Sequence, residues 1–408
     1  MSAMKITTTV LSLLTLSLAT EAPSQPFIVG AQHSSHFTTY EIVLGYRPMD
    51  NSSRVVYGSC NNYHGKRNLE CSIYLVSQLV AGDKIEFHEQ RCKVKHQAED
   101  GKVIGEDLEL GFLSDDRVLS TWLEVGGKES NAVLRVTNMR DCEFEETRIP
   151  SYGVGLPLRV AYNNTFDVFF RNASACGGMM CGQTHDTRAQ LINGPVASYL
   201  PAEFFRENTY VCPVRPASSA LGHFLLSSKL RLVSSSYGRV TELMDYPAGV
   251  VSLAFSCDHG FLGFCWIDHL DEMYVNCRQF DSRGVLELSI RIMLEYRGGQ
   301  WMAMRNLPGG GLLLLTSECN AENWCEQNVD KVSFYAYRVH RDKRVDLLRQ
   351  IKEVPCTGDG LKTDIQEKLN GTVCITFVCR GKTYAPYTNV HVDLYVKVVS
   401  RCIAWKNM

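Results

Sequence analysis

Several features that would assign this chain to a functional class are missing from its sequence. Beyond the first 22 residues no segment approaches the roughly 20 apolar residues of a membrane-spanning helix. No polybasic run occurs, and the net charge of -2 gives no electrostatic footprint for nucleic acid. The sixteen cysteines include no Cys-x-x-Cys pair, which argues against a zinc site. We therefore expect no nucleic-acid partner, membrane span, metal or cofactor.

Motifs for catalysis are also absent. The chain has no Gly-x-Ser-x-Gly elbow, no His-Glu-x-x-His helix and no phosphate-binding loop. The richest polar cluster comprises Asp258 and His259 on one side of an apolar segment, and Asp268, His269, Asp271 and Glu272 on the other. A strand of about eight residues between them would hold the two groups some 25 Å apart. The sequence therefore predicts no catalytic residue, although a hydrolase remains an alternative.

The first residues predict a secretory leader. Lys5 supplies positive charge, Val10–Leu18 is an apolar stretch of the right length, and Ala19 and Ala22 offer cleavage positions. We predict a signal peptide over 1–22 and one domain over 23–408, released to the extracellular space.

Cysteine usage agrees with an oxidising compartment. Sixteen cysteines is an even number, and none falls in the leader. Three close pairs are candidates for small disulfide loops: Cys176 with Cys181, Cys319 with Cys325, and Cys374 with Cys379. Spacing alone leaves the connectivity open.

Four sequons predict N-glycosylation, at Asn51, Asn163, Asn172 and Asn370. A glycan requires an exposed attachment point, so we expect these four segments at the surface.

Strand patterns dominate from about residue 40 onward, and only Pro201–Asn208 and Asp364–Leu369 indicate short helices. The most informative feature is a strand–turn–strand pattern that is repeated about sixty residues later. Residues 332–339, a charged turn and 345–351 repeat the plan of 272–279, a turn and 285–292. Each unit is preceded by a Gly-rich entry into an apolar strand, at Gly260–Trp266 and Pro308–Leu315.

Further hairpins are predicted with turns near residues 100, 140 and 237, so most turn centres are 40 to 60 residues apart. The final strand, His391–Val399, is predicted to pair with an N-terminal strand. Four-stranded units at such spacing are typical of a β-propeller. We predict an all-β, disulfide-stapled propeller of six to eight blades, with seven as the best guess. Tandem β-sandwiches are the alternative.

On these repeats the chain resembles secreted β-propeller proteins in general, over most of its mature length. Its cysteine-rich character is similar to that of secreted salivary or venom factors of arthropods. The resemblance implies a rigid scaffold that presents loops from one face.

The connection around Trp324 is the predicted binding loop. Trp324 lies between Cys319 and Cys325 with Glu322 and Asn323 beside it, and an aromatic side chain on a stapled loop makes a good interaction anchor. We predict that the chain binds an extracellular protein or glycan, and we favour this function over an enzymatic one. A glycan- or phosphoester-directed hydrolase and a matrix component are the alternatives.

Overall fold

The computed structural model describes residues 27–404 except for the following segments: 35–37, 48–51, 63–66, 82–83, 105–108, 114–115, 127–129, 152–157, 163–164, 171–175, 178, 202–209, 215–221, 227–228, 235–238, 320–331, 355–361, 368–371 and 385–391. Every element within the described residues is a β-strand, so the all-β prediction is confirmed. The predicted leader lies outside the described residues.

The described strands form seven antiparallel sheets. The first holds β2 (Thr38–Arg47), β3 (Ser52–Asn62), β4 (Asn68–Ala81) and β5 (Lys84–Gln97). The second holds β6 (Val103–Ile104), β7 (Glu109–Phe112), β8 (Arg117–Val125), β9 (Ser130–Asn138) and β10 (Phe144–Ser151). The third holds β11 (Leu158–Tyr162), β12 (Thr165–Phe170), β13 (Met179–Asp186) and β14 (Leu191–Pro201).

The next two sheets cover the middle of the chain. The fourth holds β15 (Tyr210–Val214), β16 (Gly222–Leu226), β17 (Lys229–Ser234) and β18 (Val240–Asp245). The fifth holds β19 (Val250–Ser256), β20 (Phe261–Asp268), β21 (Tyr274–Asp281) and β22 (Leu286–Met293).

The seventh sheet brings together strands from both ends of the described residues. The sixth holds β23 (Arg297–Asn306), β24 (Leu312–Cys319), β25 (Val332–Val339) and β26 (Val345–Val354). The seventh holds β27 (Lys362–Glu367), β28 (Thr372–Tyr384), β29 (Val392–Ala404) and β1 (Phe27–Ser34). The predicted pairing of the final strand with an N-terminal strand is confirmed, because β29 pairs antiparallel with β1.

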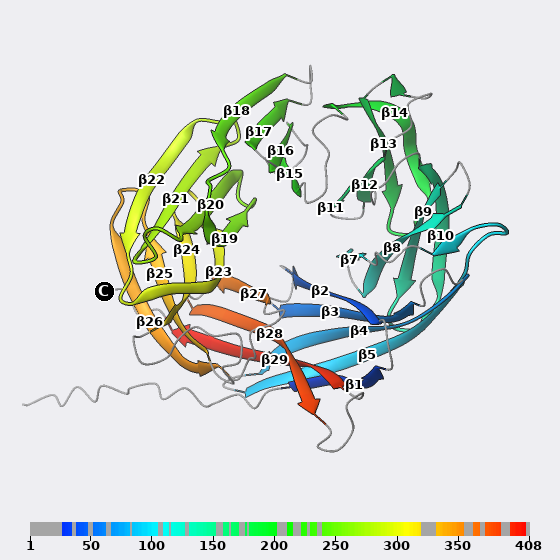
Figure 1. Cartoon of the computed structure of the whole chain (residues 1–408), viewed down its shortest axis with the longest axis horizontal. Coiled ribbons are helices and arrows are strands. Elements are labelled where there is room, and N and C mark those ends of the chain that lie inside the picture. Colours follow the sequence, from blue (N-terminus) through cyan, green and yellow to red (C-terminus); the bar gives the residue numbers. More distant parts are fainter. Residues whose placement is uncertain are drawn as a thin grey trace, which may run out of the picture.

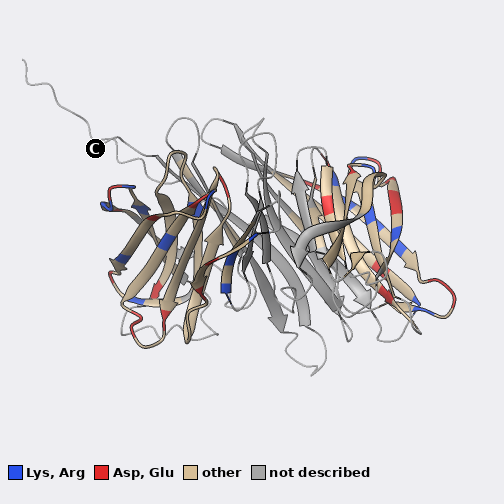
Figure 2. Ribbon diagram, turned by 90° about the horizontal axis from the view of Figure 1, so that it is seen from above, with Lys and Arg blue, Asp and Glu red and all other residues tan. Residues whose placement is uncertain are grey.

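The sheets follow one another in chain order around the molecule, and β1 lies beside β29 in the seventh sheet (Figure 1). Figure 2 views this arrangement edge-on, with the connections between strands along two opposite faces.

The apolar core lies in layers between successive sheets. One face of β25 contributes Phe334 and Ala336 to a cluster shared with the seventh sheet, where the ring of Phe334 lies 4.8 Å from that of Phe377. The other face contributes Tyr335 and Tyr337 to a cluster shared with the fifth sheet. A strand with two apolar faces is buried on both sides. The apolar residues on both faces of β25 therefore allow the sixth sheet to pack between the fifth and the seventh.

The same layering recurs elsewhere. Separate clusters join the first sheet to the second, the second to the third, and the fourth to the fifth. Leu312 to Leu315 of β24 are all buried, because this strand is covered on both faces.

Two predictions about local structure are wrong. The turn near residue 100 joins two sheets and does not close a hairpin, because β5 pairs with β4 while β6 pairs with β8. Residues 364–367 of the predicted helix segment Asp364–Leu369 belong to β27 (Lys362–Glu367), which pairs with β28. Packing of Ile365 against the core of the sixth and seventh sheets outweighs the weak local preference. The other short helix, Pro201–Asn208, falls outside the described residues beyond Pro201.

Candidate functional site

The residues predicted for binding and glycosylation lie outside the described residues. They are Glu322, Asn323 and Trp324, and the sequon residues Asn51, Asn163, Asn172 and Asn370. The strand ends nevertheless locate the connection that carries Trp324, because it leaves β24 after Cys319 and enters β25 at Val332.

The described disulfides number three. Cys176 and Cys181 are bonded to each other, with Cα atoms 5.5 Å apart. Cys92 is bonded to Cys142 and Cys265 to Cys277. These two pairings were not predicted, since their partners are 50 and 12 residues apart.

The predicted disulfide between Cys374 and Cys379 is wrong. Both residues lie on the continuous strand β28, so their Cα atoms are about 16 Å apart at the rise of a strand. A disulfide needs Cα atoms within about 7 Å. Cys374 instead stands directly opposite Cys402 of β29 in the register. For the third predicted pair, Cys319 ends β24 and Cys325 lies outside the described residues.

The polar cluster around β20 is divided between the two ends of the strand, as its length predicts. Asp258 precedes β20, and its carboxylate contacts the Arg305 side chain at 3.0 Å and the Asn306 backbone N–H at 3.1 Å. At the other end of the strand, Asp268 is its last residue and His269 follows it. The two groups do not form one site.

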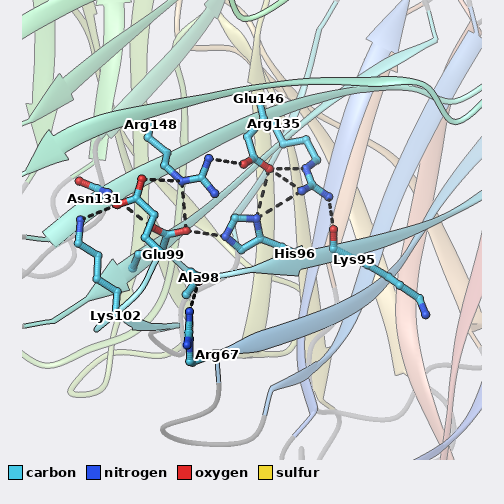
Figure 3. A network of polar contacts seen from close by, with 11 residues as sticks. Arg67, Lys95, His96, Ala98, Glu99, Lys102, Asn131, Arg135, Glu146 and Arg148 are labelled. Atoms are coloured by element: carbon cyan, nitrogen blue, oxygen red, sulfur yellow. Dashed lines mark hydrogen bonds and ion pairs between the residues drawn. The ribbon is translucent and has the colours of Figure 1, made fainter.

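Among the described residues, an extensive cluster of charged groups lies between the first and second sheets (Figure 3). His96 of β5 is at its centre, with Nε2 2.6 Å from the Glu124 carboxylate and Nδ1 3.3 Å from the Glu146 carboxylate. The side chains of His96 and Glu124 are 2% and 0% exposed. β5 therefore contributes a histidine that lies between carboxylates on β8 and β10.

Two arginines complete this network. Arg135 of β9 donates to Glu146 at 2.5 Å and to the backbone oxygen of Lys95 at 3.1 Å. Arg148 of β10 lies 3.4 Å from the Glu124 carboxylate and 2.9 Å from that of Glu146. At the outer end, Glu99 accepts from Asn131 at 3.0 Å and from Lys102 at 3.1 Å.

Burial and hydrogen bonding oppose each other at these groups. Burial acts to lower the pKa of His96, but its hydrogen bonds to Glu124 and Glu146 outweigh this and raise the pKa above 6.5. Burial acts to raise the pKa of Glu146, but hydrogen bonds from His96 and Arg135 hold it at about 2. The pKa of Glu124 is lowered in the same way, against the effect of burial, by His96 and Arg148. The raised pKa of His96 favours an imidazolium between the two carboxylates.

This network connects the two sheets, and its central groups, His96 and Glu124, are closed to a substrate. Both ring nitrogens of His96 already face carboxylates, and Glu124 is fully buried. Among the residues that the structure describes, no group of three or more His, Cys, Asp or Glu is arranged to hold a metal ion.

The His96 network predicts that stability depends on pH. Because the folded pKa of His96 is raised, its contribution is fully present below the unfolded pKa of about 6.5 and is lost as pH rises through the folded value. We expect His96→Gln to reduce the free energy of unfolding more at about pH 6 than at about pH 9. Denaturant titrations of both proteins across this range measure the difference. Arg135 lies 3.4 Å from Nδ1 and hydrogen-bonds to it if the ring is neutral, so some of the contribution persists at high pH. An equal loss at both pH values would contradict a charged His96.

A second buried carboxylate lies at the end of β24. Glu318 accepts hydrogen bonds from the Tyr337 hydroxyl at 2.5 Å, the Thr316 hydroxyl at 2.9 Å and the Tyr296 backbone N–H at 2.8 Å. Burial raises the pKa of Glu318 despite these donors, and burial together with the bond to Glu318 raises the pKa of Tyr337. This arrangement fixes the backbone of Tyr296 against β24.

Tyr296 belongs to a group of exposed apolar side chains at one end of the fifth sheet. Leu270 is 82% exposed in the β20–β21 turn, and Met293 is 67% exposed at the end of β22. Met273, Tyr246 and Tyr296 are also exposed. Since successive strands run antiparallel, the connections that carry these five residues emerge at the same end of the sheets. The β24–β25 connection, which contains Trp324, leaves its sheet at the equivalent position.

No helix among the described residues has the length and apolar character that crossing a membrane requires.

Comparison with known proteins gives no family. No protein-family model and no curated protein matches the chain. Among solved structures, a eukaryotic initiation factor has a TM-score of 0.36 and 10% identity, over 89% of this chain and 87% of that one. The S. cerevisiae core factor has a TM-score of 0.41 and 8% identity, over 93% of this chain and 62% of that one. The α-L-arabinofuranosidase of Fusarium graminearum, solved with an iminosugar inhibitor, has a TM-score of 0.38 and 8% identity, over 92% and 98%. Likenesses at this level carry no argument about what the present chain does.

Proposed function

We propose that the protein is a secreted glycoprotein that binds an extracellular partner through connections at one end of a rigid β scaffold. The observation that carries this proposal is the group of exposed apolar side chains Tyr246, Leu270, Met273, Met293 and Tyr296. Large apolar side chains gathered on an otherwise polar surface mark interaction sites more often than isolated ones do. Their backbones are held by stacked sheets and by Glu318, so the surface is formed before binding.

Secretion is supported by the leader-like N-terminus and by the three described disulfides, which persist in an oxidising compartment. Three of the four sequons, Asn51, Asn163 and Asn370, fall between the first and second strands of their sheets. In a regular ring of sheets those connections emerge opposite the apolar end. Glycans at these three positions would leave the proposed binding end free, whereas Asn172 falls between β12 and β13, a connection at the same end as the apolar group but of the third sheet.

We expect the full chain, expressed in a eukaryotic secretory host, to be recovered from the medium without residues 1–22. Treatment with an N-glycosidase is expected to lower its mass, because glycans are removed from up to four sequons. Intact-mass measurement and N-terminal sequencing check both points. Retention of the protein inside the cell with an intact leader would contradict this part of the proposal.

The proposed architecture is a single seven-bladed β-propeller, joined by the pairing of β1 with β29. The seven sheets, six of four strands and one of five, the apolar layers between neighbouring sheets and the β1–β29 pairing support it. In tandem sandwiches the apolar layers would fall within separate pairs of sheets. Here the sixth sheet shares one layer with the fifth and another with the seventh.

A single propeller is expected to unfold as one cooperative unit. Calorimetry of the oxidised protein should therefore show one transition, and deletion of residues 27–34 should lower its midpoint as a whole, because β29 loses its neighbour. Tandem sandwiches would unfold in separate transitions, and the deletion would leave most of them unchanged.

The binding function is tested by affinity capture from extracellular fluid with purified, oxidised protein. The expected result is a partner retained by the wild-type protein and lost with the variant Leu270→Ser/Met293→Ser. The control is Leu286→Ser/Leu347→Ser, which changes two leucines that are about half exposed at the other end of the strands. Failure of the wild-type protein to retain any partner would contradict the proposal.

A further inference from the structure

The apolar end of the fifth sheet is also acidic, and we propose that it binds a cationic, amphipathic segment of an extracellular protein. This inference rests on the proposed binding function and specifies its partner. The surface, here called the acidic end, consists of three segments: 245–249, 268–273 and 291–297.

Backbone hydrogen bonds join the three segments directly. His269 N–H donates to the Gly249 oxygen at 2.9 Å, which links the first segment to the second. Leu294 N–H donates to the Met273 oxygen at 2.9 Å, which links the second to the third. The exposed apolar side chains therefore lie on adjoining, fixed pieces of backbone.

Charge distinguishes this end from the opposite one. The acidic end contains Asp245, Asp268, Asp271, Glu272 and Glu295 against Arg291 and Arg297, so five negative and two positive charges give a net charge of -3. The three connections at the opposite end, 256–261, 281–286 and 305–311, contain Asp258 and Asp281 against Arg283 and Arg305. Two negative and two positive charges give a net charge of zero there.

The two arginines of the acidic end are already paired. Arg291 contacts the Asp271 carboxylate and Arg297 contacts the Glu272 carboxylate. Arg291 also lies over the ring of Tyr274, 4.0 Å from its centroid.

Of the other carboxylates, Asp245 lies 3.7 Å from Lys229 of β17 and Asp268 lies 3.5 Å from His269, whereas the exposed Glu295 has no Lys or Arg ion partner among the described residues. With Lys229 included, five negative and three positive charges still leave this surface a net charge of -2.

This combination of features selects the partner. Exposed apolar side chains favour a partner with an apolar face, and the surrounding carboxylates favour Lys and Arg beside that face. An anionic membrane surface would be repelled by the same carboxylates. A protein segment with apolar residues along one side and basic residues along the other satisfies both requirements.

The test uses a synthetic amphipathic peptide of about 18 residues, composed of Leu and Lys at helical spacing, and a counterpart with Glu in place of Lys. Isothermal titration measures Kd with the full oxidised protein. The Leu/Lys peptide is expected to bind the wild-type protein, and the Leu/Glu peptide is expected to bind at least about tenfold more weakly. Binding of the Leu/Lys peptide should weaken as salt rises.

Two variants separate the contributions of apolar contact and charge. Leu270→Ser/Met293→Ser is expected to weaken binding of the Leu/Lys peptide at least about tenfold, because the apolar contact area is lost. Asp268→Lys/Glu295→Lys is expected to weaken it by several-fold at low salt and less at high salt. Leu286→Ser/Leu347→Ser, at the other end, is expected to leave Kd unchanged.

Three outcomes overturn the inference: equal affinity for the two peptides, no loss with Leu270→Ser/Met293→Ser, or an equal loss with the control variant. Different results would contradict the proposed binding function. If a partner is captured from extracellular fluid by both the wild-type protein and Leu270→Ser/Met293→Ser, binding stands and the acidic end is the wrong surface. If no partner is captured and no peptide binds, both the function and the inference are wrong.

Discussion

Replacing Glu124 with alanine is expected to lower the free energy of unfolding by about 3–5 kcal/mol. The Glu124 side chain is fully buried and contacts His96 at 2.6 Å and Arg148 at 3.4 Å. Removing the carboxylate leaves the His96 imidazolium without one of its two partners in a site that water does not reach. The variant loses the attraction between Glu124 and His96 and also leaves a buried charge without its partner. The second penalty is the larger one, so the effect on stability is large.

Denaturant unfolding measures this effect, and two further variants interpret it. Glu124→Gln keeps the volume but loses the charge, so most of the destabilisation should remain. Glu242→Ala removes one partner of the exposed Lys229–Glu242 pair and is expected to leave stability almost unchanged. If Glu124→Ala and Glu242→Ala had similarly small effects, the His96 network would not hold the first two sheets together.

Removal of the Cys92–Cys142 disulfide by replacing both residues with alanine is expected to cost about 4 kcal/mol. This bond links β5 of the first sheet to the β9–β10 connection of the second, across a sequence separation of 50. A loop of this length has much conformational entropy in the unfolded chain, which the bond removes. The bond and the His96 network therefore fasten the same pair of sheets.

The Cys176–Cys181 bond provides a control on the same protein. Its sequence separation is 5, so the corresponding double alanine variant is expected to cost only about 2 kcal/mol. Chemical denaturation of the oxidised proteins compares the two. An equal loss would show that loop entropy does not account for the stabilisation.

The sequence predicted the hairpins best where a polar turn separates two alternating apolar segments. The segments 332–339 and 345–351 appear as β25 and as part of β26, and the earlier copy of the pattern appears as β21 and β22 within two residues. The prediction failed near residue 100, where local turn residues look the same whether the next strand pairs backward or begins a new sheet. Pairing there is decided by β8, which lies further along the chain.

The His96 network was missed because its members are far apart in sequence. His96 and Glu146 are 50 residues apart, and the residues around each of them form no recognisable motif. One signal was present: Glu124 and Arg135 interrupt the apolar strands β8 and β9, whose residues are otherwise nearly all buried. A charged residue within such a strand requires a partner. Which partner it meets depends on how the sheets stack.

The exposed apolar residues were likewise visible in the sequence but not interpretable from it. Leu270 and Met293 fit a strand end as well as a core position, and only the antiparallel order of the sheets places them at one end with Tyr246 and Tyr296. Trp324 was selected from its loop alone, and the order of strands brings its connection to the equivalent end of the neighbouring sheet.

Hydrogen exchange of the protein, alone and with its captured extracellular partner, tests the proposed binding surface most directly. The account predicts that the partner slows exchange in residues 268–273 and 291–297 and leaves 281–286 and 305–311 unchanged. Slower exchange confined to 281–286 and 305–311 would contradict it, because binding would then occur at the opposite end of the sheets.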